Sequence, residues 1–279
     1  MSSVRVALLT ALAMIAFAAN SLLCRLALRH TAIDPATFTS IRVIAGAVVL
    51  WALARARSGR RGSGNWLSAF ALVAYAAGFS LAYVSLSAGT GALLLFGSVQ
   101  ATMIGYGVWR GERLRSAQLL GLLLAGGGIV GLLSPGLAAP PLTGAACMIA
   151  AGIAWGIYSL RGRSGGDATA VTAGNFIRAV PITLLLSLLM LNRLSIDVTG
   201  TLYAIASGAL ASGVGYAIWY TALPQLRATI AATVQLSVPV IAALGGVLLL
   251  GEQLTLRLIL ASIAILSGIA LVILGKSRV

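Results

Sequence analysis

The stretch GALLLFGSVQATMIGYGVWRGERL, residues 91–114, is an apolar run that ends on a charged tetrapeptide. The same ending returns 140 positions later as GEQL at residues 251–254, again directly after an apolar run. Only five residues of the chain are acidic, and two of them, Glu112 and Glu252, occupy this repeated setting. The repetition predicts two equivalent halves whose fourth helix ends in the same way.

A second match supports this duplication. SIRVIAG at residues 40–46 resembles NFIRAVP at residues 175–181, and a shift of 136 places Arg42 over Arg178. We therefore predict a first repeat over residues 1–139 and a second over residues 140–279. If each repeat holds five helices, the odd number makes the two copies enter the membrane in opposite directions.

The composition is that of an integral membrane protein. Of the 279 residues, 59% are hydrophobic and 9% are charged, and the mean hydropathy is +1.02. Such values exclude an ordinary soluble domain. A bilayer core about 30 Å thick needs about 20 apolar residues per helix. Charges, prolines and glycine clusters divide the chain into ten such spans, at residues 4–28, 36–54, 66–87, 91–110, 116–134, 142–160, 170–190, 199–222, 227–250 and 256–274.

The net charge of +14 fits a membrane protein without any nucleic-acid partner. The cations lie in short loops between apolar runs, and positive loops of this kind face the cytoplasm. With the N-terminus inside, 13 of the 19 cations fall on the cytoplasmic side and four on the other. The sequence therefore predicts that both termini are cytoplasmic. The predominance of arginine over lysine favours a GC-rich bacterium, and hence the bacterial inner membrane.

The repeated pattern resembles a known family. Each half has a polar break in its first helix (FAANSLLCRLAL, residues 17–28), an arginine early in its second helix (DPATFTSIRVIAGA, residues 34–47) and the GE-x-L ending after its fourth. In this order the features resemble the EamA family of the drug/metabolite transporter superfamily, and most closely its YddG-type exporters of aromatic and other amino acids. The resemblance implies an all-α membrane protein, with ten transmembrane helices forming two inverted five-helix repeats around a central cavity.

Polar side chains in the middle of a span are the first candidates for a transport path, because such groups are costly in a bilayer. An alternative role is a hydrogen bond between helices, which contributes about 0.6 kcal/mol on average. The polar candidates for substrate binding are Asn20, Gln100, Asn175, Arg178 and Gln235.

Aromatic side chains gather in the third, sixth and eighth spans. Tyr75, Phe79 and Tyr83 follow one another at intervals of four and form one helical stripe. Such a stripe can equally be packing or lipid contact. We take Tyr83, Trp155 and Tyr158 as candidates for the apolar wall of a binding site.

Two residues are candidate hinges. Pro239 in the ninth span removes a backbone donor and tends to kink a helix. The matching part of the fourth span carries Gly97 instead. Interrupted helices at matching places in two repeats point to a binding site, although a kink also occurs without any function.

Glu112 and Glu252 have two interpretations. In the structural one, each carboxylate marks a helix end, its glycine lets the chain turn, and the anion docks on a helix N-terminus. In the functional one, each glutamate makes a gate contact at one face of the membrane.

Several absences narrow the function. All five acidic residues fall in predicted loops or at span ends, so a proton-coupled mechanism lacks its usual mid-membrane carboxylate. His30 is the only histidine, and Cys24 and Cys147 lie at apolar helix positions. We therefore expect no metal site, no cofactor, no catalytic residues and no enzyme activity.

Together these features predict a secondary transporter that exports small amphipathic solutes, with amino acids favoured, by alternating access. The expected partners are a small-molecule substrate and the lipid bilayer, and the protein is expected to be a monomer driven by the substrate gradient. The same fold with a nucleoside, drug or other metabolite as cargo is the first alternative. A membrane-embedded enzyme would need paired acids or a metal, and a channel would need a charged or carbonyl-lined ring.

Overall fold

The fold is described by a computed structural model, which covers residues 1–58, 63–136, 139–162 and 167–276. Arg60, Arg61, Arg163 and Arg278, counted above among the cytoplasmic cations, lie outside these residues. The helices are α1 (Ser3–His30), α2 (Pro35–Ser58), α3 (Trp66–Tyr83), α4 (Ala88–Trp109), α5 (Ser116–Leu133), α6 (Leu142–Arg161), α7 (Ala168–Leu189), α8 (Val198–Ala206), α9 (Gly215–Ala222), α10 (Ala228–Gln235), α11 (Ser237–Leu250) and α12 (Leu256–Lys276). Short 3₁₀ turns, η1 (Leu191–Arg193) and η3 (Leu223–Gln225), follow α7 and α9, and a π-helical turn, η2 (Ser207–Val214), joins α8 to α9.

The ten predicted spans are confirmed. Within the described residues, ten helical segments are long and apolar enough to cross a membrane, and each coincides with a predicted span to within a few residues. The eighth span consists of α8, η2 and α9 in continuous succession. The ninth consists of α10 and α11, which are separated at Leu236.

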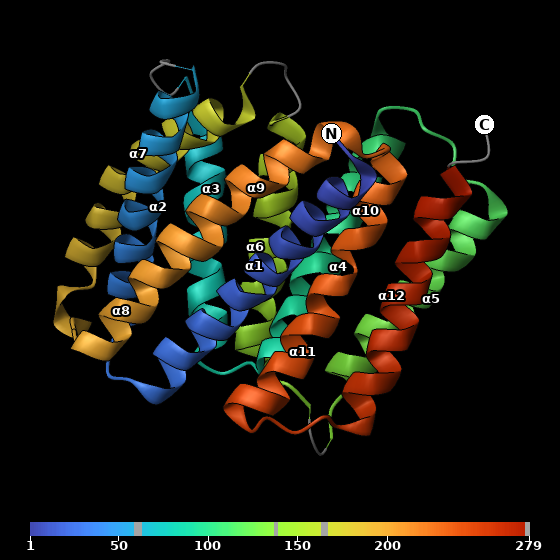
Figure 1. The fold of residues 1–279 in the computed structure, drawn as a ribbon. Coiled ribbons are helices and arrows are strands. Elements are labelled where there is room, and N and C mark those ends of the chain that lie inside the picture. The colour runs from blue at the N-terminus through green and yellow to red at the C-terminus, as the bar shows by residue number, and fades with distance from the viewer. Residues whose placement is uncertain (59–62, 137–138, 163–166, 277–279) are drawn as a thin grey trace.

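The packing shows the predicted inverted repeat. Both termini lie at one end of the bundle, where α1 begins, whereas α6 begins at the opposite end (Figure 1). Equivalent helices pack on one another across the two halves, α2 on α7, α4 on α11 and α5 on α12. The first helix of each repeat also packs on the third and fourth spans of the other repeat. Helix α6 packs on α3 and α4, and α1 packs on α9 of the eighth span and α11 of the ninth. The fold class is thereby confirmed.

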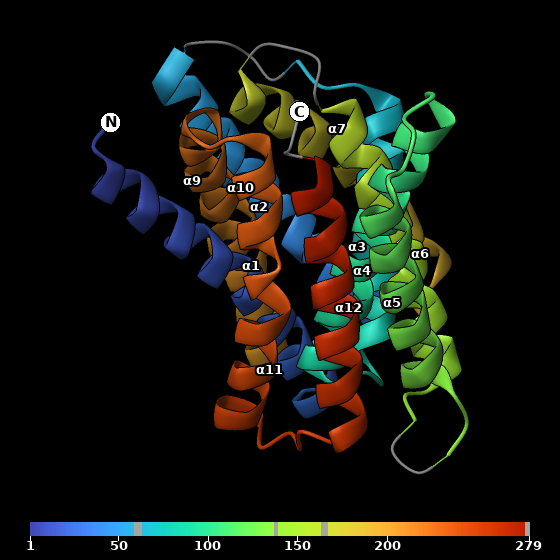
Figure 2. The ribbon, with the colours of Figure 1, turned by 90° about the vertical axis from the view of Figure 1, so that its right-hand side faces the viewer.

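Helices α5 and α12 form a peripheral pair at one side of the bundle (Figure 2). Most of α5 faces outward, and Leu123 in its middle is 74% exposed. The most buried segments are instead α3 and the first half of α4, where every residue from Ala88 to Gln100 is buried. Helices α3 and α4 are therefore part of the core around which a solute path can form.

The candidate hinges are placed differently from expectation. Helix α4 runs unbroken past Gly97, so the predicted interruption there is wrong. The ninth span is interrupted, but at Leu236, which leaves Pro239 in the first turn of α11, where a missing N–H costs no helical hydrogen bond. The eighth span carries the π-helical turn instead. Whether Gly97 or Pro239 bends during transport stays a prediction.

The two GE turns are similar in outline but differ by one residue in the hydrogen bond that closes them. Gly111 and Gly251 both have left-handed backbones, with φ of 94° and 65°, which glycine adopts at no steric cost. After each glycine the chain folds back, and the glutamate N–H donates to Gly107 O in the first turn and to Gly246 O in the second, both at 3.0 Å. Each carboxylate then lies over one of these glycines, where a larger residue would collide with it. The predicted role of the tetrapeptide as a turn is confirmed.

Candidate functional site

The bundle encloses a central cavity of about 840 Å³, a size that suits a small metabolite. Its wall combines apolar side chains with amides, hydroxyls and aromatic rings. The polar and aromatic lining residues in the middle of the spans are Phe17, Asn20, Ser21, Tyr75, Phe79, Phe96, Gln100, Trp155, Tyr158, Thr172, Asn175, Ser212, Tyr216, Trp219, Tyr220 and Gln235.

Six of the eight candidate binding residues line this cavity: Asn20, Gln100, Trp155, Tyr158, Asn175 and Gln235. They come from α1, α4, α6, α7 and α10, so both halves of the chain contribute. Sequence reasoning selected them because they are polar or aromatic in mid-span. The fold brings them to one place.

Trp155 is the centre of an aromatic stack. Its ring lies nearly parallel to those of Tyr158 and Tyr216, with centroid distances of 5.1 and 5.4 Å and interplanar angles of 20° and 18°. The Tyr75 ring is 4.7 Å away at a tilted angle. This stack offers planar apolar faces to a solute, and the faces of such rings also attract cations.

A polar network lies beside the stack, between α1, α2, α3 and η2. Asn20 Nδ2 donates to Tyr75 Oη at 3.3 Å, and Ser207 Oγ donates to Asn20 Oδ1 at 2.6 Å. Arg42 Nη2 donates to the same Tyr75 Oη at 3.0 Å. Tyr75 therefore accepts from two donors at once.

Arg42 is a buried charged residue beside this network that sequence reasoning did not select as a candidate. Only 2% of it is exposed, and its guanidinium lies over the rings of Phe79 and Tyr75, at 4.9 and 5.3 Å from their centroids. Its Nη1 is buried without a hydrogen-bond partner. The alignment that matched Arg42 with Arg178 contained the necessary signal, but nothing in it showed which arginine faces the centre.

The remaining amides differ in how fully they are engaged. Asn175 is engaged at both atoms of its amide, because it donates to Tyr158 Oη at 3.2 Å and accepts from Asn65 N at 2.8 Å. Gln235 donates back to Ala231 O within α10. Gln100 lines the cavity, and within the described residues its side-chain amide forms no hydrogen bond. Gln100 is thus the amide best placed to bind a solute.

Tyr83 and Arg178 do not line this cavity, so the structure does not bring them together with the other six candidates. Tyr83 is fully buried near the end of α3, where its ring lies against Gly91 and its hydroxyl donates to Ala88 O at 3.3 Å. Arg178 folds back along α7 and donates to Gly174 O at 3.0 Å. The position of Tyr83 along α3 and the direction in which Arg178 leaves α7 keep these two side chains out of the cavity wall.

The end of the bundle opposite the termini is closed by an ion pair between the two halves. Arg25 Nε in α1 lies 3.1 Å from Glu252 Oε1, and both side chains are largely buried. Arg25 Nη1 also donates to the carbonyls of Tyr83 and Val84, at 2.9 and 3.0 Å. Glu252 Oε2 accepts from Ala88 N, at the start of α4, at 2.8 Å. Glu252 thus docks on a helix N-terminus and also joins the halves.

The other end of the cavity, where both termini lie, reaches the surface. The lining continues there through Tyr106, Arg110, Glu112 and Gly162, all of which are exposed. At the closed end the lining stops at Ser21, well short of the end of α1. The structure therefore shows a one-ended cavity.

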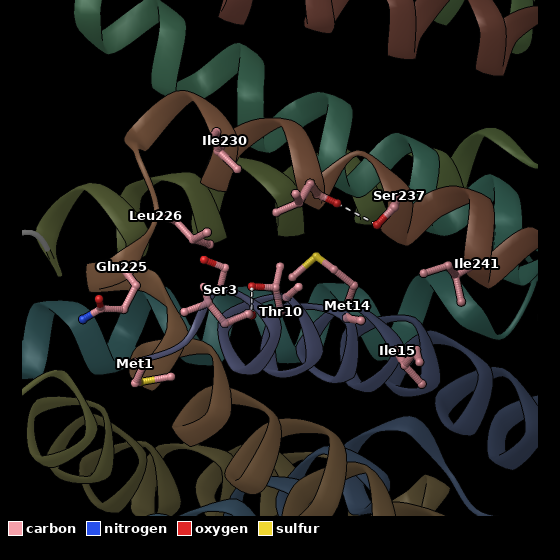
Figure 3. A pocket seen from close by; sticks show the side chains of 14 residues that line it. Met1, Ser3, Thr10, Met14, Ile15, Gln225, Leu226, Ile230, Ser237 and Ile241 are labelled. Atoms are coloured by element: carbon pink, nitrogen blue, oxygen red, sulfur yellow. Dashed lines mark hydrogen bonds between the residues drawn. The ribbon is translucent and has the colours of Figure 1, made fainter.

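A second hollow of about 710 Å³ lies along the side of the bundle (Figure 3). Side chains of α1, such as Met14 and Ile15, face Ile230 in α10 and Ile241 in α11 across it. The N-terminal half of α1 leans away from the bundle at this place (Figure 2). This hollow is mainly apolar and lies apart from the aromatic stack.

Outside the spans, carboxylates cap helices. Asp34 Oδ1 accepts from the backbone of Ala36 and Thr37, and its Oδ2 accepts from Ser195 N at 3.1 Å. Burial acts to raise the pKa of this carboxyl, but the hydrogen bonds from Thr37, Ser195 and Ala36 hold it below its usual value. The described residues contain no group of three or more His, Cys, Asp or Glu side chains that could hold a metal ion.

Ten apolar helices in two inverted units, around a polar and aromatic cavity open at one end, define a membrane carrier of small solutes. The model of the EamA-like transporter family matches the chain twice, over residues 4–134 and 142–274. The chain therefore belongs to the EamA-like transporter family, and it is a membrane transporter of small metabolites.

The similar proteins agree with this family. An uncharacterized protein of Pseudomonas aeruginosa is 57% identical over 271 residues, which cover 96% of this chain and 94% of that protein. An uncharacterized transporter of Archaeoglobus fulgidus is 26% identical over 220 residues, or 74% of this chain and 75% of the relative. A crystal structure of a protein with 20% sequence identity matches the whole of both chains with a TM-score of 0.69, which supports the fold.

Proposed function

We propose that the protein exports small amphipathic metabolites, chiefly amino acids including aromatic ones, by alternating access. The observation that carries this proposal is the one-ended cavity lined by the Trp155 stack and the free amide of Gln100. An aromatic side chain can pack against the faces and edges that such rings present to the cavity. An ammonium group gains about 0.5–2 kcal/mol from each ring face that it contacts. A nucleoside could use the same stack, so it is retained as the second candidate cargo.

Alternating access requires one gate at each end, and the repeat supplies both. Arg161 matches Arg25 at the shift of 136 that also matches Arg178 with Arg42, and Glu112 matches Glu252 at a shift of 140. In this structure Arg161 donates to Ser68 Oγ and Asn65 Oδ1, at 3.3 and 3.2 Å, and Glu112 lines the mouth of the cavity. In the proposed cycle, Arg161 and Glu112 pair when Arg25 and Glu252 separate.

The proposed orientation follows from the loop charges. The termini and the open end of the cavity face the cytoplasm of a bacterial inner membrane, so the structure is the loading state of a monomeric exporter. Impermeant thiol reagents test this in intact cells, with cysteines placed singly at exposed Ser2 and Asn192 in a chain lacking Cys24 and Cys147. Only the cysteine at 192 should be labelled from outside, and labelling at position 2 would reverse the orientation.

The cargo is tested with purified protein in liposomes loaded with labelled amino acids or nucleosides. We expect saturable efflux of phenylalanine and related amino acids, with no accumulation driven by an imposed pH gradient. Trp155→Ala should slow this efflux severalfold, whereas Leu123→Ala on the outer face of α5 should not. Efflux of nucleosides without amino acids would show that the cargo is wrong, and pH-driven accumulation would show that transport is proton-coupled.

A further inference from the structure

The most unusual group inside the membrane is the Arg42 guanidinium, which is buried without a carboxylate partner. All five acidic residues of the chain lie in described segments, and none of them forms an ion pair with Arg42. Its contacts are one hydrogen bond to Tyr75 and the faces of two aromatic rings. Buried charges in proteins are normally paired, because an unpaired charge in a medium of low dielectric constant is costly. The chain therefore supplies no carboxylate to Arg42, although a buried cation favours an anionic partner.

The Tyr75 hydroxyl connects this charge to the cavity. Tyr75 lines the cavity, and its oxygen already accepts from Asn20 and Arg42. A phenolic hydroxyl has two acceptor lone pairs and one proton to donate. With both lone pairs occupied, the proton remains for an acceptor, and no described residue accepts it. The hydroxyl is thus set as a donor toward the solute path.

The surroundings supply more donors than acceptors. Ser212 also lines the cavity, and its buried Oγ has no hydrogen-bond partner. The nearby acceptor Asn20 Oδ1 is already bonded to Ser207. Arg42 Nη1 is a second unpartnered buried group. A cation with spare donors and no carboxylate is the chemistry that binds an anionic oxygen.

We infer that the cavity contains a carboxylate subsite, in which the Tyr75 hydroxyl donates to a carboxylate of the substrate and Arg42 behind it supplies the positive charge. This inference rests on the proposed transport of amino acids, and it assigns the two ends of such a solute. The carboxylate lies at Tyr75, and the aromatic or ammonium part lies along the Trp155 stack. Arg42 acts through Tyr75 and is a positioning residue.

The test is binding to the purified protein, measured by calorimetry with three probes that share a phenyl ring. L-phenylalanine and 3-phenylpropionate carry a carboxylate, and 2-phenylethylamine does not. The wild-type protein should bind both carboxylates more tightly than the amine. Arg42→Ala should weaken carboxylate binding by about tenfold or more, as expected for a charge-assisted contact, and leave the amine nearly unchanged. Arg42→Lys should restore part of the preference.

Two further variants separate binding from folding. Tyr75→Phe keeps the ring and removes only the hydroxyl, so it should reduce the preference for a carboxylate severalfold in a folded protein. Arg178→Ala removes the equivalent arginine of the other half, which lies off the cavity wall, and it should retain the preference. The inference is overturned if wild type shows no preference for carboxylates, or if Arg42→Ala and Tyr75→Phe keep it. Binding of 3-phenylpropionate but not phenylalanine would support the subsite and reject amino acids as cargo.

Discussion

Arg25 in α1 and Arg161 in α6 occupy matching places in the two halves, but they do different things. Arg25 bonds to Glu252 and closes its end of the bundle, whereas Arg161 donates to Ser68 in α3 and to Asn65, the N-cap of α3, at the other end. The cavity follows this difference, since it is sealed beside Arg25 and reaches the surface beside Glu112. Two copies of one sequence pattern can therefore adopt opposite states within one molecule.

The largest expected effect comes from removing the seal at the closed end. Tyr83→Ala deletes a fully buried ring that packs against Gly91 and Phe79. Truncating a buried aromatic residue to alanine costs about 3–5 kcal/mol. The variant should therefore unfold at a clearly lower temperature in detergent and should leak solute. An unchanged unfolding temperature would mean that the closed end is not held by this ring.

The next effect concerns the ion pair itself. Arg25→Glu removes the hydrogen bonds of the Arg25 guanidinium, and a hydrogen bond to a charged group contributes about 1.5–3 kcal/mol. The loss should shift the population toward the state that is open at this end. A cysteine at Met103, which lines the cavity, should then react more slowly from the side of the termini. The double change Arg25→Glu with Glu252→Arg should restore part of the wild-type rate. Failure of the swap to restore anything would count against a pairwise gate.

A smaller effect is expected at the open end. Arg161→Glu or Glu112→Arg should slow transport severalfold, because the proposed pair is needed only in the opposite state. Labelling of the cysteine at Met103 from the side of the termini should stay fast, unlike in Arg25→Glu. The double swap should recover transport. If the single changes leave transport at the wild-type rate, the two ends are not equivalent gates.

The smallest effect is a dependence of stability on pH through Asp34, which lies at the closed end but outside the Arg25 network. Its pKa is lowered in the folded state, so its contribution is present at neutral pH and is lost as the pH falls through the folded pKa. Asp34→Ala should cost about 1 kcal/mol at pH 7, as for other helix caps, and should flatten the acid limb of an unfolding curve. A parallel acid limb in wild type and variant would contradict this.

The sequence was sufficient for the architecture because the relevant signals are local. Apolar runs of fixed length define the spans, and the repeated GE turn defines the duplication, down to a left-handed glycine in each half. The candidate site was predicted less completely. Mid-span polarity led to Gln100 and the gathering of aromatic residues to Trp155. Tyr83 shares a helical stripe with Tyr75 but does not line the cavity.

The missed features depend on rotation and on asymmetry between the halves. Arg42 and Arg178 are indistinguishable by alignment, and only packing places the first beside Tyr75 and the second along α7. The π-helical turn in the eighth span contains no proline that would have predicted an irregular helix there. The interruption at Leu236 lies three residues before the proline that seemed to mark it. Such details are set by neighbouring helices rather than by the local sequence.

The π-helical turn η2 also gives the middle of the eighth span an irregular backbone beside the cavity. A stretch of π-helix shifts the register of backbone hydrogen bonds, and its carbonyls and amides at the edges need other partners. Ala211 and Ser212 face the cavity, so solvent entering from the open end can supply those partners at the depth of the bilayer core. In deuterium exchange the amides of η2 should therefore label earlier than those in the middle of unbroken α4.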